Sequence, residues 1–148
     1  MNILDWKTLK VSYGDGSHIP EAIKSLCSPD QEERERAYWL LDNFIIVQGR
    51  LYEAAYYCID ELVNSLLKDD CIFKEVVLDL LIELSLGKSL PGDFINENGI
   101  LVELEIACWN KLKAYLNQFK IITTFDDRSK QALQDLIEIL DSPIELQL

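Results

Sequence analysis

The chain has 148 residues, of which 49% are hydrophobic and 27% are charged, a balance typical of a folded globular protein. Its 26 acidic residues outnumber its 14 basic ones and give a net charge of −12, so its surface repels nucleic-acid phosphates and anionic lipid heads. We therefore expect a basic protein partner, and neither nucleic acid nor a membrane. The length fits one domain that buries its own core.

The sequence carries no recognisable targeting signal. Asp5 and Trp6 interrupt the start of the chain, where a signal peptide needs an apolar run, and the most apolar stretch, residues 76–86, is too short to span a bilayer. The cysteines are Cys27, Cys58, Cys71 and Cys108. Because they form no close pairing motif, we expect buried free thiols and a protein of the reducing cytoplasm.

Apolar spacing and helix caps predict helices separated by short breaks. In chain order they cover residues 19–26, 30–47, 51–66, 70–87, 101–116 and 126–142, and residues 88–97 form a loop. After a leader at 1–18, these helices divide into pairs at 19–47, 51–87 and 98–140, all within a single domain at 1–148.

Three predicted helix starts share one register. In each, an Asp is followed four residues later by a cation, and seven and eleven residues later by apolar residues. The sets are Asp30, Arg34, Ala37 and Leu41; Asp70, Lys74, Val77 and Leu81; and Asp126, Lys130, Leu133 and Ile137. The Asp would cap the helix, the cation could pair with it, and the apolar residues would share one face.

The repeat predicts the fold class. Residues 19–26 align with residues 59–66 with half of the pairs identical, and the step between the first two units is about 40 residues, as in HEAT repeats. We expect an all-α, right-handed HEAT-like αα superhelix of about three helix pairs plus a short N-terminal helix. An unrelated helical bundle is the alternative.

Particular residues also carry a family resemblance. They are Trp6, Tyr13-Gly14, Ile19-Pro20, Asp30, Arg36-Ala37 and Gln48-Gly49-Arg50-Leu51-Tyr52-Glu53-Ala54. In these elements the chain resembles a group of small bacterial HEAT-like proteins, well over residues 6–87 and loosely beyond. The resemblance implies no catalytic residues. Because some small HEAT-like proteins are encoded beside secreted polymorphic toxins as cognate immunity proteins, it also implies such a role.

One face of the predicted helices is acidic. Residues five, nine, and twelve or thirteen positions after each Asp point away from the core. They are Glu35, Trp39 and Asp42; Glu75, Asp79 and Glu83; and Gln131, Asp135 and Glu138. This face is either the solvated side of three amphipathic helices or a partner-binding surface, for which all but Gln131 are our candidates. Tyr38, Tyr52, Tyr56 and Tyr57 either extend it or pack between helices.

The parts of a catalytic site are missing from the sequence. His18, the only histidine, lies in a turn where we expect it to cap or pack locally, and Gly14-Asp15-Gly16 is too short for a phosphate loop. No Cys/His pair has metal-ligand spacing. We therefore expect no enzyme, no cofactor and no metal.

Two functions follow from these features. The first is an immunity or inhibitor protein that covers the active site of a cationic toxin, for example a nuclease, with an acidic surface. The alternative is a structural adaptor or scaffold of HEAT-like build without a toxin partner. An enzyme on a helical scaffold is a third reading, which a deep pocket lined by several of the carboxylates would favour.

Overall fold

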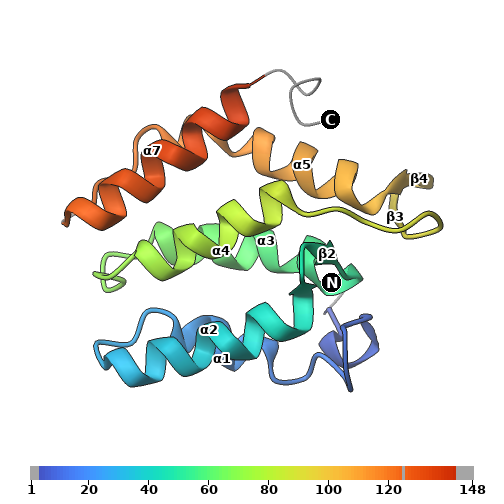
Figure 1. Cartoon of the computed structure of the whole chain (residues 1–148), viewed down its shortest axis with the longest axis horizontal. Coiled ribbons are helices and arrows are strands. Elements are labelled where there is room, and N and C mark those ends of the chain that lie inside the picture. The colour runs from blue at the N-terminus through green and yellow to red at the C-terminus, as the bar shows by residue number, and fades with distance from the viewer. Residues whose placement is uncertain (1–3, 125, 143–148) are drawn as a thin grey trace.

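The helices pair in three tiers that lie one on the next, as Figure 1 shows for the computed structural model of the chain. The structure describes residues 4–124 and 126–142. The first tier holds α1 (Ile19–Ser25) and α2 (Gln31–Ile45), the second α3 (Glu53–Leu66) and α4 (Glu75–Leu86), and the third α5 (Leu104–Ala114) and α7 (Asp127–Asp141), with the short α6 (Leu116–Phe119) between them. The expectation of a mostly helical protein is confirmed.

The tiers form two layers. Helices α1, α3 and α5 contact one another in sequence on one side, and α2, α4 and α7 do so on the other. The helices that follow Asp30, Asp70 and Asp126 are therefore neighbours, as the shared register predicts. Helix α4 contacts α2, α3, α5 and α7, and together with α3 it forms the centre of the fold.

Helix α4 is covered on most of its circumference. Its buried side chains include those of Val77, Leu78, Leu80, Leu81 and Leu84. Each such apolar side chain contributes about 1.5–3 kcal/mol when it is fully removed from water. The register positions seven and eleven residues after each Asp are buried in α2 and α4, whereas in α7 the second of them is only half-buried.

Two small antiparallel sheets correct the all-α expectation. One pairs β1 (Ile46–Val47) with β2 (Arg50–Leu51), and the other pairs β3 (Phe94–Glu97) with β4 (Ile100–Glu103). Their two-residue turns, Gln48-Gly49 and Asn98-Gly99, have positive φ at both positions, the geometry that suits the right-handed twist of a hairpin. The helix expected from residue 101 therefore begins at Leu104. In the described part of the leader, residues 4–18, the helical element is a 3₁₀ turn, η1 (Trp6–Thr8).

The predicted Asp caps form at two helices of three. The side chain of Asp30 accepts from the Glu32 amide (3.1 Å) and that of Asp126 from the Ser129 amide (2.8 Å). Asp70 caps nothing, because α4 begins five residues later and Lys74 occupies its N-cap position.

The cations of the shared register do not pair with their Asp residues. Arg34 Nη1 donates to the carbonyl of Ser28 (2.8 Å), and its guanidinium lies over the Phe73 ring. Lys74 is buried, and its Nζ donates to the carbonyls of Lys68 (3.3 Å) and Cys71 (2.7 Å). Arg34 and Lys74 instead fix the segment before α4.

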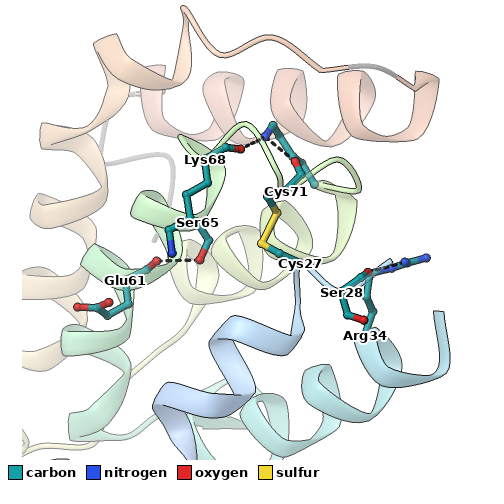
Figure 2. The surroundings of a disulfide bond; sticks show 8 residues. Cys27, Ser28, Arg34, Glu61, Ser65, Lys68 and Cys71 are labelled. Atoms are coloured by element: carbon teal, nitrogen blue, oxygen red, sulfur yellow. Dashed lines mark hydrogen bonds between the residues drawn. A yellow bond between two sulfur atoms is a disulfide. The ribbon is translucent and has the colours of Figure 1, made fainter. Parts of the chain in front are cut away.

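A disulfide joins the first two tiers, contrary to the expectation of four free thiols. Cys27, just after α1, is bonded to Cys71, in the segment before α4 (Figure 2). Although 44 residues apart in sequence, the two Cα atoms lie 4.7 Å apart because the tiers stack. Only Cys58 and Cys108 are buried free thiols in the described part of the chain. The argument for a reducing cytoplasm, which rested on free thiols, is therefore lost.

Replacing Cys27 and Cys71 together with Ser should lower the free energy of unfolding by about 2–4 kcal/mol, because the unfolded chain regains the freedom that the cross-link removes. Urea unfolding of the oxidised protein checks this value. Dithiothreitol should destabilise the native sequence and leave the double variant unchanged. An equal response of the two proteins to the reductant would mean that the bond does not form.

Asp126→Ala should cost about 0.5–2 kcal/mol of stability because it removes a helix cap. Asp70→Ala is the matched control, and since this exposed residue caps no helix it should change stability by less than about 0.5 kcal/mol. Thermal or urea unfolding of both variants measures the difference. Equal losses would restore Asp70 as a cap.

Candidate functional site

The candidate residues come together on the layer formed by α2, α4 and α7, and we name their surface the acidic face. Its members are Glu35, Trp39 and Asp42 on α2, Glu75, Asp79 and Glu83 on α4, and Gln131, Asp135 and Glu138 on α7. Glu35, Trp39, Gln131 and Glu138 are exposed, and the other five are half-buried. Because the three helices are neighbours, these side chains form rows that run side by side.

A hydrogen-bonded cluster joins α2 to α4 on this face. The Tyr38 hydroxyl donates to Oε1 of Glu83, and the carboxyl groups of Glu83 and Asp42 are hydrogen-bonded to each other. Burial, together with the bond to Asp42, raises the pKa of Glu83 to about 7. Two carboxyl groups in contact cannot both ionise cheaply, so Glu83 keeps its proton up to about neutral pH.

Asp79 on α4 also has a raised pKa, and its charged neighbours include a residue of α7. Burial raises its pKa to about 6, and the nearby charges of Glu75 and Asp135 add to the rise. Asp135 in turn accepts a hydrogen bond from Nε2 of Gln131 (2.8 Å). The negative charges of the two helices are thus close enough to repel one another. Electrostatic coupling therefore extends from α2 through α4 to α7.

Within the described residues, no basic side chain forms an ion pair with this surface. The ion pairs in the described part of the chain are Lys24–Glu21, Arg50–Asp93, Lys88–Glu105, Lys111–Asp60 and Lys120–Asp141, none of which involves the acidic face. Like charges four residues apart, such as Glu75 and Asp79, destabilise a helix by about 0.2–0.5 kcal/mol. The described residues also include no group of three or more His, Cys, Asp or Glu placed to hold a metal ion.

An apolar edge borders the carboxylates. Trp39 is 59% exposed and its neighbour Leu40 is 39% exposed. The Trp39 ring meets the Tyr38 ring edge-on, with 6.0 Å between the ring centroids. A large exposed aromatic residue beside desolvated charges is typical of the residues that contribute most to protein–protein binding.

A hollow of about 390 Å³ lies at the N-terminal end of the acidic face. Its lining includes Glu35 from α2, Glu75 from α4, and Asp126 at the start of α7, with Arg34 and Arg128 also present. These two arginines partly offset the negative charge there. The hollow is therefore less acidic than the centre of the face around Glu83.

The other residues considered from sequence pack locally. Nε2 of His18 lies 2.9 Å from the Leu40 carbonyl oxygen, and its ring meets that of Phe44 edge-on. Tyr56 and Tyr57 lie on α3, in the opposite layer, beneath the ammonium of Lys111. Of the four candidate tyrosines, only Tyr38 is bonded to the acidic face. The feature of the sequence that distinguishes Tyr38 from the other three tyrosines is its position next to Trp39, a member of the acidic face.

Comparison with known protein families, curated proteins and solved structures found no match for this chain. Within residues 4–124 and 126–142, none of the helices combines the length and the apolar character needed to cross a membrane.

The acidic face should make stability depend on pH. Because the folded-state pKa values of Glu83 (about 7) and Asp79 (about 6) lie above their ordinary values, the folded protein binds more protons than the unfolded chain between about pH 4 and pH 7. Their contribution to stability therefore falls as the pH rises through this window. Glu83→Gln keeps an acceptor for Tyr38 and removes the charge, so it should raise the melting temperature at pH 8 and change it little at pH 5.

Melting curves of the native protein, Glu83→Gln and the control Glu61→Gln at the two pH values measure this effect. Glu61 is exposed on α3, so its replacement should leave the pH dependence as it is. Parallel pH profiles for all three proteins would contradict the proposed clustering.

Proposed function

We propose that the chain is a protein-binding module that inhibits a cationic protein, as an immunity protein inhibits its toxin, through the acidic face. The observation that carries the proposal is the row of half-buried carboxylates Asp42, Glu83, Asp79 and Asp135, gathered from three helices without a basic partner. This arrangement lowers the stability of the free protein. A cationic partner would relieve the repulsion.

The extent of the face favours a protein over a small ion as the partner. The carboxylates span three helices, and the exposed Trp39 and Leu40 offer an apolar anchor at their edge. Interfaces gain most of their affinity from such aromatic anchors, while surrounding charges guide and accelerate association. A small cation would use only a fraction of this surface.

A nuclease is the kind of toxin that this chemistry fits best. An enzyme that binds polyanionic substrates has a basic active site, and a surface rich in carboxylates resembles that substrate in charge. We propose that inhibition works by covering this site. The chain itself would supply no catalytic group, cofactor or metal.

The proposed scaffold is a right-handed HEAT-like αα superhelix. The three stacked tiers and the repeated register of α2, α4 and α7 support it. In such a fold the second helix of each pair lines one continuous surface, which is where binding residues gather. The acidic face occupies that position.

A structural adaptor is the second candidate. A separate region favours it: the hairpin β3–β4 exposes Leu101 (66%) and Ile100 (67%), far more apolar surface than a core-facing hairpin would leave open. An adaptor would use this region and the acidic face for two different proteins.

Replacing Glu75, Asp79 and Glu83 with Lys should weaken binding of the cationic partner at least a hundredfold, mostly through a slower association rate at low salt. The test uses the purified product of a neighbouring gene that encodes a basic domain, with binding followed by surface plasmon resonance and inhibition followed by its nuclease activity. The milder pair Asp79→Asn and Glu83→Gln should weaken binding with less effect on folding.

The matched control replaces Glu21, Glu61 and Asp69 with Lys, which gives the same net charge. These three residues are exposed and lie outside the acidic face. Binding should weaken far less in this variant. If the two triple variants lose affinity equally, overall charge and not the acidic face drives recognition, and the proposal fails.

A further inference from the structure

A hollow of about 600 Å³ lies outside the acidic face, between the leader, β2 and the hairpin β3–β4. We name it the hairpin groove. Its lining includes Lys7 and Lys10 from the leader, Arg50 from β2, and Phe94 and Leu101 from the hairpin. The volume is within the range of sites that bind ligands. None of the acidic-face residues lines it.

Basic side chains outnumber acidic ones in this groove, although the whole chain carries a net charge of −12. The acidic residues of the lining, Glu53 and Asp93, are already engaged. Oε1 of Glu53 accepts from the backbone amide of Lys10 (2.8 Å), and Oδ2 of Asp93 accepts from the amide of Leu90 (3.2 Å). The side chains of Lys7 and Lys10 form no ion pair within the described residues.

Arg50 lacks a hydrogen-bond acceptor. Its Nε is buried and has no partner in the described structure. Its Nη2 lies 3.7 Å from Oδ2 of Asp93, which is an ion pair but too long for a hydrogen bond. The guanidinium also lies over the Tyr52 ring, 4.6 Å from its centroid, which holds it in place. Because Nε is buried, a ligand in the groove would meet the Nη groups of this partly exposed side chain, and a guanidinium held in this way is suited to a carboxylate.

The opposite wall of the groove is apolar. The strand register pairs Phe94 with Glu103 and Asn96 with Leu101, so Phe94 and Leu101 share the outward face of the hairpin, while Ile95 is buried on the other face. Phe94 is 46% exposed and Leu101 is 66% exposed. The groove therefore places an apolar surface opposite a set of cations.

We propose that the hairpin groove binds an extended segment of a second protein in which a carboxylate stands beside apolar side chains. The carboxylate binds Arg50, and the positive charges of Lys7 and Lys10 in the same groove add to the attraction. The apolar side chains pack on Phe94 and Leu101. In the described structure β3 and β4 pair only with each other, so the hairpin also offers a strand edge to an extended segment. This partner has the opposite charge to the one that the acidic face attracts.

The test uses two fluorescein-labelled peptides, Leu-Glu-Leu-Glu-Leu and Leu-Lys-Leu-Lys-Leu, and fluorescence anisotropy at low and high salt. The glutamate peptide should bind the native protein despite the negative net charge, and more weakly at high salt. Arg50→Gln should weaken its binding about tenfold, the effect of losing a hydrogen bond to a charged group. Arg50→Lys should keep only part of the native affinity, since Lys lacks the planar guanidinium that can donate two hydrogen bonds to one carboxylate.

Lys7→Gln combined with Lys10→Gln gives a second test that does not depend on Arg50, because both side chains are exposed. This double substitution should weaken binding of the glutamate peptide severalfold. Leu101→Ser should have the same effect, because it removes part of the apolar wall. Lys24→Gln, on α1, is the control and should change nothing. Melting curves confirm that each variant is folded.

Two results would overturn the inference. One is a glutamate peptide that does not bind the native protein, and the other is equal binding to the native protein and to Arg50→Gln. The double substitution Asp79→Asn and Glu83→Gln should leave binding of the glutamate peptide unchanged and weaken binding of the lysine peptide. The outcome for the hairpin groove can therefore be separated from the outcome for the acidic face.

Discussion

The position of α4 is the constraint on which the rest of the structure depends. Neighbouring helices α2, α3, α5 and α7 cover most of its surface, which is why most of its apolar residues are buried. One stripe is left open, and it carries Glu75, Asp79 and Glu83. Because helices press in from both sides, Asp79 and Glu83 lose part of their water, and their pKa values rise. The same packing that stabilises the fold therefore gives the acidic face its strained electrostatics.

Carboxylates in this position do not serve the stability of the free chain. Asp42 and Glu83 could be amides and keep their hydrogen bonds without the repulsion. Groups that lower stability without an ion pair or a cap to compensate are concentrated at functional sites in proteins. This reasoning supports an interaction role for the acidic face, and it is independent of the resemblance to small bacterial HEAT-like proteins. The hairpin groove adds a second, oppositely charged surface, which an adaptor would also need.

Much of the helical framework could be predicted from the sequence, because the signals were local. Asp30 and Asp126 cap helices where expected, and helical periodicity identified the acidic face. Both hairpins were missed although Asn98-Gly99 between apolar runs is a strong turn signal, and Gln48-Gly49 was interpreted as the end of a helix. The disulfide could not be predicted, since Cys27 and Cys71 meet only through the stacking of two tiers. For the same reason the start of α4 was misplaced: Asp70 has the sequence of a cap, but the segment after it extends toward Cys27.

The raised pKa of Glu83 has a thermodynamic consequence for any complex formed on this surface. A cation docked there stabilises the ionised carboxylates and lowers their pKa values, so protons held near neutral pH are released to the solvent. The heat of association then includes the protonation of the buffer. Calorimetry in buffers of different ionisation enthalpy would count the protons released when the complex forms.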